Sequence, residues 1–400
     1  SLDPRRFGNW ITTDYTARKN EESYEHVFIL HHPDEEREAC RPLKTAPSYE
    51  RQKTRGAQFG QVNGWERPNY FATIGFDDLS SRSFRRGAWW DFVKEEAIAV
   101  RKTAGLIDAT AFTKHVIKGP GATAFLDWFT CNKLPKVGRI NLTYALTEKG
   151  TTRTEYTIVR VKHDEYYLVS AGAWQAYDAD FLIKAIQDKE MEFGRIELQD
   201  VTSQFGVFAI AGPNSRAILS DLVRHPEPET VFSNKNFPWL SAKSIELGMC
   251  PVNAIRVAYT GELGWELHHP IEMQNYLFDQ LENSGQKHGM KLVGARAQNW
   301  LRQEKSYRAF GTELGRDATP LEADLSRFID LDKIFQGKEK MLEKGIRSKC
   351  VTLLIDGPDD ADPWGREALF HNGTKVGRLT SGGFSVVFNK QIGMGYVSEK

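Results

Sequence analysis

The chain has 400 residues, 40% of them apolar and 26% charged, which is the composition of a globular protein with about two to three domains. Its 53 lysines and arginines balance 53 aspartates and glutamates, so a net charge of zero gives no support for a nucleic-acid or membrane-surface partner and leaves a small polar ligand as the open option. No stretch approaches the roughly 20 apolar residues of a membrane span, and the four separated cysteines give no signature of a zinc site, an iron–sulfur cluster or a disulfide framework.

Residues 1–80 form a polar, irregular stretch with few periodic apolar positions. Such a stretch cannot bury enough apolar surface to fold alone, so we expect it to pack on another surface. The chain begins at Ser1 with neither an initiator methionine nor a signal-peptide pattern. We therefore interpret it as a processed chain or as part of a longer one.

Regular patterning starts near Trp89, where apolar residues spaced by three and four predict an amphipathic helix that stops at Gly105. The alternating side chains that begin at Arg153 predict a strand, and a turn at 163–165 leads into a return strand. The elements predicted in this part are helices over 90–104 and 122–129, strands over 153–161 and 166–169, and a helix around 181–186.

A strand, a Gly-Pro turn and a helix start occur twice, at 119–120 and again at 212–213, about 93 residues apart. This recurrence suggests two duplicated subdomains. The elements predicted in the second half are a strand over 208–210, a helix from 215, a hairpin of 255–257 with 265–267, helices over 273–285 and 295–309, and strands over 350–355, 367–370, 377–380 and 393–397. The last four strands, separated by Gly and Asn turns, predict a small β-barrel-like domain.

The segment from Tyr259 to Glu266 is the strongest local signal for a ligand site. Two glycines punctuate a short connection between predicted strands, so the two residues would oppose each other across the ladder and share one face. A carboxylate offers two acceptors in one plane, which matches the two adjacent N–H donors at the edge of a pterin or guanine ring. The alternative is a solvent-exposed hairpin with a surface carboxylate.

Glu155 lies on a strand face that otherwise presents Thr157 and Val159. A carboxylate among inward-facing residues is costly to bury unless it is paired or neutralised, and such a setting raises the pKa of the carboxyl group. Glu155 is therefore a candidate proton acceptor. The alternative is a glutamate at a strand end that meets Arg153 or Arg160 at the surface.

Arg302 and Glu304 are two positions apart on a predicted helix and so face different directions. Arg302 is a candidate clamp for the carboxylate tail of a ligand, with a helix-surface ion pair as the alternative. The histidine doublets at 31–32 and 268–269 invite a metal interpretation, but neighbouring residues on a strand point to opposite faces, so we expect no metal site. No GxGxxG follows a strand and no P-loop motif is present, which leaves a dinucleotide fold unsupported.

Four motifs in chain order resemble those of the glycine-cleavage T-protein, the folate-dependent aminomethyltransferase. They are Gly-Leu-Ile-Asp at 105–108, the segment 259–266, Leu-Arg-Gln-Glu-Lys at 301–305 and Thr-Pro-Leu-Glu-Ala-Asp-Leu at 319–325, and the closing segments 376–383 and 393–397 fit too. The resemblance covers about residues 85–397. It implies an α+β fold of three parts around a central folate channel, with a small C-terminal β-barrel-like domain.

A closer resemblance is to the C-terminal half of the dimethylglycine and sarcosine dehydrogenase family. Residues 3–8, 41–43, 49–51 and 64–68 resemble the linker that joins the flavin domain of that family to its folate domain. In that family the flavin domain oxidises an N-methyl amine, and the folate domain captures the released one-carbon unit as 5,10-methylenetetrahydrofolate. Because this chain has no flavin fingerprint, the resemblance implies FAD only on a missing domain or a partner subunit.

The resemblance also implies roles for matching residues. Tyr259 and Glu266 would bind the pterin of tetrahydrofolate. Glu155 would be catalytic, at a position where many members carry an aspartate. Arg302 would lie near the folate pocket and orient Glu304 or the ligand.

The resulting division of the chain is a linker-like segment (1–80) that packs on a flavin domain or partner, two folate-binding subdomains (81–204 and 205–345) and a C-terminal domain (346–400) that we expect to be incomplete. We predict tetrahydrofolate as the cofactor, a small-molecule one-carbon donor, a flavin-dependent amine-oxidising domain or subunit as the partner, and a cytoplasmic location, or the mitochondrial matrix in a eukaryote. Two alternatives stay open: a direct folate-dependent O- or S-demethylase, and a non-catalytic regulatory relative.

Overall fold

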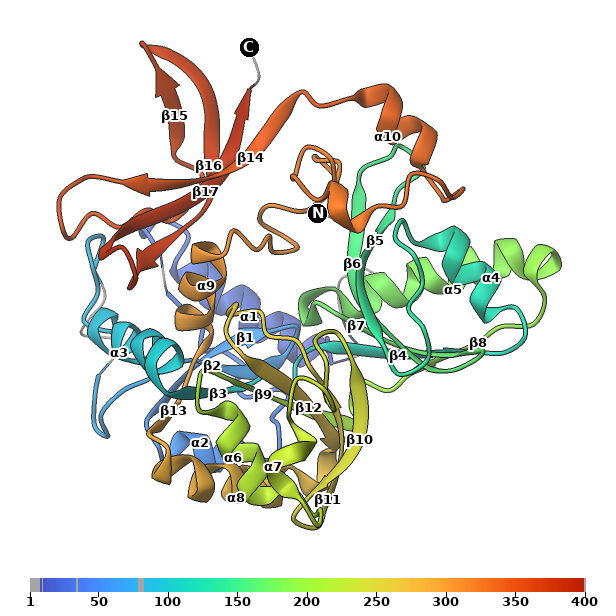
Figure 1. Ribbon diagram of the computed structural model, residues 1–400. Helices are drawn as coiled ribbons and strands as arrows, with labels where there is room; N and C mark the ends of the chain where they lie inside the picture. Colours follow the sequence, from blue (N-terminus) through green and yellow to red (C-terminus); the bar gives the residue numbers. More distant parts are fainter. Residues whose placement is uncertain (1–7, 9, 34, 78–82, 399–400) are drawn as a thin grey trace.

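The computed structural model describes residues 8, 10–33, 35–77 and 83–398. Within these residues the strands form a five-stranded, a six-stranded and a four-stranded sheet and one two-stranded hairpin. In Figure 1 the five-stranded sheet lies at the right, the six-stranded sheet at the bottom and the four-stranded sheet at the top left. The mixture of helices and sheets agrees with the predicted α+β class.

The two larger sheets are built by the same succession of elements, as the repeated Gly-Pro turn suggests. Each begins with a strand, a helix and three antiparallel strands, and continues through a 3-10 turn into a long helix. The first set is β4 (Thr113–Lys118), α4 (Ala122–Phe129), β5 (Ile140–Leu146), β6 (Thr152–Lys162), β7 (Glu165–Ser170), η2 (Gly172–Trp174), α5 (Gln175–Phe193) and β8 (Glu197–Asp200). The second is β9 (Phe205–Ala211), α6 (Ser215–Leu222), α7 (Pro228–Val231), β10 (Ala242–Leu247), β11 (Cys250–Ile255), β12 (Gly264–Pro270), η3 (Ile271–Met273), α8 (Gln274–Lys287) and β13 (Met290–Leu292).

The strand orders make this correspondence explicit: β5-β6-β7-β4-β8 in one sheet and β10-β11-β12-β9-β3-β13 in the other. The six-stranded sheet also takes β3 (Ala104–Asp108), which precedes the first set in the chain and pairs with β9 and β13. Phe208, Trp265 and Leu277 lie in the apolar core on one face of this sheet. Phe125 and Leu182 belong to the core between the five-stranded sheet and its helices.

The remaining elements join these sheets to both ends of the chain. The N-terminal part contains α1 (Thr13–Glu25), α2 (Tyr49–Lys53) and the hairpin of β1 (Ala57–Val62) and β2 (Trp65–Phe71), followed by α3 (Trp90–Lys102). The C-terminal part contains α9 (Ala295–Glu304), η4 (Ser326–Phe328), α10 (Lys338–Lys344), β14 (Ser348–Ile355), β15 (Ala368–His371), β16 (Thr374–Ser385) and β17 (Lys390–Ser398). The last four strands form an antiparallel sheet in the order β14-β17-β16-β15, so the predicted C-terminal strands are confirmed.

Several predicted boundaries are wrong. The helix that starts near Trp90 ends at Lys102, and Gly105 lies inside β3 rather than at a helix stop. The helix predicted over 295–309 ends at Glu304, because Ser306 adopts a left-handed backbone with φ of 57°.

The N-terminal stretch is more regular than its composition indicates. It contains a helix and a hairpin, and Tyr70 is buried against the aromatic cluster of α3 and α9. Residues 3–7 of the linker-like motif lie outside the described residues. In the described part of the chain, no helix combines the length and apolar character that crossing a bilayer requires.

Candidate functional site

Glu155 lies near the middle of β6, directly opposite Tyr144 of β5. Opposed residues of an antiparallel pair share a face, and the Tyr144 hydroxyl donates to Glu155 Oε1 at 3.4 Å. The surface alternative for Glu155 is wrong. Arg153 donates to Asp178 instead, and Arg160 donates to a backbone carbonyl in the turn after β6.

Burial dominates the electrostatics of Glu155. Removing the carboxylate from water disfavours its charge and raises its pKa to about 7, although the hydrogen bond from Tyr144 and the charge of Arg302 act to lower it. A carboxyl group whose pKa lies near neutral pH can take up and release a proton under physiological conditions. The surroundings of Glu155 in the folded chain therefore raise its pKa, as expected from the sequence.

Glu266 is held by a hydrogen-bonded chain that crosses between the two sheets. Glu266 and His268 lie on the same face of β12, and their side chains meet at 3.3 Å between Oε2 and Nε2. The other ring nitrogen of His268 is 3.0 Å from the hydroxyl of Tyr167 on β7. Burial lowers the pKa of His268, so the ring is neutral and carries one N–H.

Because His268 is neutral, the direction of the hydrogen bonds that connect Tyr167, His268 and Glu266 can be assigned. If Nε2–H donates to Glu266, Nδ1 accepts the proton of Tyr167, and all three groups are satisfied. Among the described residues no side chain or backbone N–H donates to Oε1 of Glu266, and the side chain keeps 13% of its surface exposed. This carboxylate therefore fits a ligand that presents adjacent N–H donors, as a pterin does.

Glu155 and Glu266 face the same region between the sheets. Val159, four residues from Glu155 on the same face of β6, packs in one cluster with Ile255 of β11. Ile255 is the register partner of Glu266 and so shares its face of the six-stranded sheet. Four residues of strand span about 13 Å, so the two carboxylates stand at separate points of one inter-sheet region.

Tyr259 does not oppose Glu266, and that expectation is wrong. The ladder of β11 and β12 closes with Ile255 opposite Glu266, and Tyr259 lies in the connection over 256–263. Its hydroxyl donates to the Arg308 carbonyl at 2.8 Å, and its ring stacks with Tyr307 at 6.2 Å between centroids.

The charges that act on Tyr259 include that of Glu155, the candidate catalytic residue, and not that of Glu266. Burial raises the pKa of Tyr259, which is also coupled to the charges of Arg302 and Glu155. A phenol in this setting stays protonated and offers its ring and its hydroxyl oxygen to the site.

Arg302 is 2% exposed, and its guanidinium is bound by protein groups. It donates to Glu313 at 2.7 Å, to Ser381 at 2.7 Å and to Asn299 at 3.0 Å. The alternative of a surface pair with Glu304 is wrong, since both side chains lie inside. A role for Arg302 toward folate stays a prediction. Its positive charge acts to lower the pKa of Glu155 and that of Tyr259.

Glu304 pairs instead with Arg101 of α3, which also binds Glu262. Arg101 further donates to the Thr260 carbonyl at 3.2 Å. Glu262 and Thr260 belong to the connection that carries Tyr259, so Arg101 fastens that connection to α3 and α9.

Sequence reasoning missed Tyr144, Tyr167, His268 and Arg101. Tyr144, Tyr167 and Arg101 each contact a partner on another strand or helix, and no local spacing shows such a pairing. His268 lies two residues after Glu266 on β12, a spacing that places both side chains on one face and could have identified it. The alternation of residues 140–146 is the one signal that could have placed Tyr144 on an inward face, and only the register sets it opposite Glu155.

Within the described residues no group of three His, Cys, Asp or Glu side chains is arranged to hold a metal ion. His268 and His269 point to different surroundings, since His269 contacts the Leu267 carbonyl and stacks on Phe208. All four cysteines are free thiols.

Comparison with known proteins gives three family matches. Residues 48–333 match the GCVT N-terminal domain, and residues 349–400 match the glycine cleavage T-protein C-terminal barrel domain. Residues 1–46 match the central domain of FAD dependent oxidoreductases. The first match alone covers more than half of the chain and includes every candidate site residue.

Individual relatives agree with these matches. The chain is 36% identical to human mitochondrial dimethylglycine dehydrogenase, over 99% of this chain and 45% of the relative. It is 29% identical to the mouse mitochondrial pyruvate dehydrogenase phosphatase regulatory subunit, over 99% of this chain and 46% of the relative. It thus spans about half the length of these curated relatives. The crystal structure of the glycine cleavage system aminomethyltransferase T from Bartonella henselae superposes with a TM-score of 0.74 at 25% identity, covering 89% of this chain and 90% of that one.

Proposed function

The chain belongs to the glycine-cleavage T-protein family, as the T-protein-like half found in dimethylglycine and sarcosine dehydrogenases, and on this premise we propose that it binds tetrahydrofolate and captures on it a one-carbon unit released by oxidative N-demethylation. The product that we propose for this reaction is 5,10-methylenetetrahydrofolate. The observation that carries the proposal is the pair of carboxylates, Glu155 and Glu266, that face one region between the two repeated sheets.

The two carboxylates have different surroundings and so suit different tasks. Glu266 accepts one hydrogen bond from His268 at Oε2, so Oε1 and the second acceptor position of Oε2 are left for a bidentate contact to the two N–H donors of a pterin edge. Glu155 has a pKa near 7, which suits a group that accepts a proton and passes it on. Tyr259 stands close enough to Glu155 for electrostatic coupling and offers an aromatic face to the ring system.

Tetrahydrofolate supplies two amine nitrogens that share the one-carbon unit as a methylene bridge. The first of them would attack the carbon of an iminium or formaldehyde, the amine or water would then leave, and attack of the second nitrogen on the same carbon would close the ring and release the proton of that nitrogen. Glu155 would accept that proton. The protein adds proximity and a site shielded from water, effects worth up to about 7–11 kcal/mol where the geometry is ideal.

Calorimetric titration with tetrahydrofolate tests the binding site. We expect saturable binding by the unaltered chain and loss of binding in Glu266→Ala, because the variant lacks the acceptor for the pterin edge. Glu246→Ala is the matched control, since Glu246 lies on β10, two strands from β12 in the same sheet, and its side chain forms only an exposed pair with Arg224. Unchanged affinity in Glu266→Ala would refute the pterin assignment.

Product analysis separates this proposal from a direct O- or S-demethylase. Incubation of the chain with formaldehyde and tetrahydrofolate should yield the methylene form above the spontaneous rate. A methyl-ether or thioether substrate that yields 5-methyltetrahydrofolate would favour the demethylase.

A non-catalytic regulatory role is the second candidate, because one relative is named as a phosphatase regulatory subunit. The hydrogen bond between Tyr144 and Glu155 and the hydrogen bonds that connect Tyr167, His268 and Glu266 favour catalysis over this role. Weak or absent folate binding together with no one-carbon exchange would support the regulatory role.

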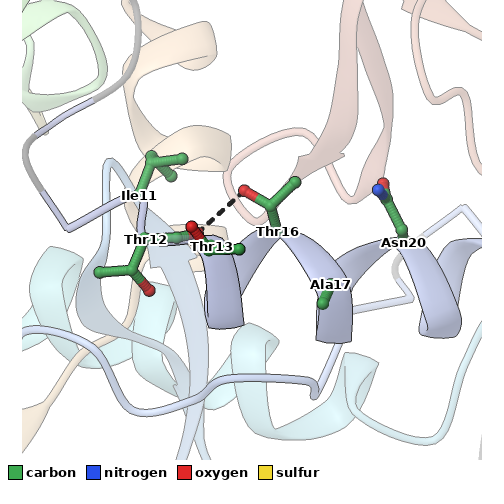
Figure 2. Close-up of a pocket in the computed structure, with 6 residues that line it drawn as sticks. All are labelled: Ile11, Thr12, Thr13, Thr16, Ala17 and Asn20. Carbon is green, nitrogen blue, oxygen red and sulfur yellow. Dashed lines mark hydrogen bonds between the residues drawn. The ribbon is translucent and has the colours of Figure 1, made fainter.

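The N-terminal part suggests where a flavin-dependent partner would dock. Helix α1 has no buried residue, although an isolated helix of this length is marginal in water. A shallow hollow of about 440 Å³ lies along its threonine-rich face, where Thr16 donates to the Thr12 carbonyl at 3.0 Å (Figure 2). The end of α1 and the turn after it expose a run of large side chains: Tyr24 (80%), Val27 (57%), Phe28 (95%), Ile29 (57%) and Leu30 (82%).

This surface, which we call the α1 surface, lies within the residues that match an FAD dependent oxidoreductase domain. The proposed occupant is therefore a flavin-binding, amine-oxidising domain or subunit, in the cytoplasm or the mitochondrial matrix. A photo-crosslinking residue at position 28 should capture a flavin-carrying polypeptide in cells, whereas the same residue at exposed Met191 should not. Capture of a second copy of this chain at position 28 would contradict the assignment.

A further inference from the structure

Tyr144 and Glu155 depend on each other for hydrogen bonding. Within the described part of the chain, the Tyr144 hydroxyl is the one donor to the Glu155 carboxylate, and Glu155 is the one acceptor of that hydroxyl. Tyr144 is 1% exposed, so its hydroxyl has little access to bulk water. A buried phenol without an acceptor is costly, which favours the pairing.

The ring of Tyr144 is fixed by its surroundings. It packs edge-on against Phe328, with ring centroids 6.4 Å apart, and belongs to an apolar cluster with Leu314 and Leu325. These neighbours come from the long connection after α9, which closes over β5. The hydroxyl is therefore presented to Glu155 in one orientation.

Among the described residues, no cationic side chain donates a hydrogen bond to Glu155 in place of Tyr144. Arg302 acts on Glu155 through its charge, but its guanidinium is bound to Glu313 and Ser381. Tyr259, the third titratable group coupled to Glu155, donates its own proton to a backbone carbonyl.

We propose that Tyr144 is a positioning residue for Glu155: it holds Oε1 in place and leaves Oε2 free for the proton that the reaction releases. This inference rests on the proposed function, in which Glu155 accepts that proton. Tyr144 itself need not touch the folate.

Removing the hydroxyl has a defined electrostatic consequence. The phenol donates to the ionised form of Glu155 and thereby lowers its pKa. Loss of that donor raises the pKa further, so a larger fraction of Glu155 is protonated at pH 7 and unable to accept a proton. The 3.4 Å separation is long for an O–H···O bond, so we expect a shift of about 0.5 to 1 pH unit.

The test is Tyr144→Phe, with Tyr156→Phe as the matched control. Tyr156 is the next residue after Glu155, is fully buried, points to the opposite face, and its hydroxyl has no hydrogen-bond partner among the described residues. The carboxyl titration of Glu155 is followed by ¹³C NMR, with Glu155→Gln used to assign the signal. The transfer rate is measured over the same pH range.

In Tyr144→Phe we expect the titration midpoint and the rising limb of the rate profile to move up together, with the KM for folate unchanged. Neither should move in Tyr156→Phe. An unshifted midpoint in Tyr144→Phe would overturn the inference. An unaltered chain that titrates normally but transfers no one-carbon unit would refute the proposed function instead, because the NMR titration requires no folate.

A second variant covers the case in which Tyr144→Phe does not fold. Replacing Tyr144 by 3,5-difluorotyrosine keeps the shape of the ring and makes the hydroxyl a stronger donor. The midpoint of Glu155 should then fall rather than rise. A midpoint that fails to fall would count against the role of Tyr144.

Discussion

The pKa of Glu155 sets the pH range in which the proposed reaction can run. With a pKa of about 7, the ionised, proton-accepting form increases as the pH rises from 6 to 8. We expect the transfer rate, after subtraction of the spontaneous reaction, to rise through a midpoint near pH 7. Glu155→Gln should remove this limb and lower the rate by about 10²–10⁴. Glu96→Gln is the control, because Glu96 also has a raised pKa but binds backbone N–H groups of Phe71 and Gly294.

The same raised pKa predicts a cost in stability. The folded chain binds the Glu155 proton more tightly than the unfolded chain, so its contribution to stability is complete below pH 4.5 and is lost as the pH rises through 7. Glu155→Gln should therefore increase the free energy of unfolding at pH 8 by about 1–3 kcal/mol, and the gain should shrink toward pH 4.5. Urea unfolding at both pH values measures it. An equal gain at the two pH values would contradict the assignment of this pKa.

His268 is predicted to act on ligand binding through Glu266. His268→Phe removes the donor that orients Oε2 and leaves the Tyr167 hydroxyl without its acceptor. Folate affinity should fall by about tenfold, which corresponds to one hydrogen bond to a charged group. Calorimetry on His268→Phe and on Tyr167→Phe checks this, and the second variant should show the smaller loss because the histidine can still donate. Wild-type affinity in both variants would exclude the positioning role.

The connection over 256–263 is the element whose fixation matters most to the site. Arg101 binds Glu262 and the Thr260 carbonyl within it and anchors both to Glu304 of α9. Arg101→Met should loosen the connection, speed its cleavage by proteases and weaken folate binding several-fold. Lys291→Met is the control, since it breaks only an exposed pair with Glu95. Equal cleavage rates in the two variants would contradict the role of Arg101.

This connection also shows what periodicity predicts and what it does not. The strand around Trp265 and the helix that starts at Trp90 followed from apolar spacing because each buries one face locally. The strand predicted over 255–257 is wrong in its bounds, because β11 spans Cys250–Ile255. The prediction that Tyr259 opposes Glu266 failed because the ladder ends at Ile255, and eight residues separate Ile255 from the start of β12. Arg101 binds the connection that follows the ladder, and that contact is distant in sequence.

The site residues divide in the same way. Glu155 and Glu266 could be singled out because a carboxylate on an inward face is unusual wherever it occurs. Their partners could not, because the pairing of Tyr144 with Glu155 depends on strand register and that of Tyr167 with His268 on how two sheets face each other. Arg302 appeared to be a free clamp, since its buried partner Glu313 lies eleven residues further on, beyond the end of α9.

At the scale of the whole molecule, Arg302 and Glu313 join the C-terminal sheet to the rest of the fold. Arg302 projects from α9, and its guanidinium reaches Glu313 and, on β16, Ser381. Glu313 accepts further hydrogen bonds from Thr380 and Ser381. Burial acts to raise the pKa of Glu313, but the charge of Arg302 and these hydroxyl donors lower it below its usual value.

Breaking this pair from one side should therefore cost far more than removing a surface charge. Arg302→Met leaves the Glu313 carboxylate buried without its cation, and we expect a loss of about 3–5 kcal/mol in the free energy of unfolding together with faster hydrogen exchange in β16. Arg224→Met is the control, because Arg224 and Glu246 are 64% and 60% exposed and their pair should contribute about 1 kcal/mol or less. Arg302→Met combined with Glu313→Gln removes both charges and should recover part of the loss. A double variant as unstable as Arg302→Met alone would mean that packing of the arginine, rather than its charge, holds the C-terminal sheet in place.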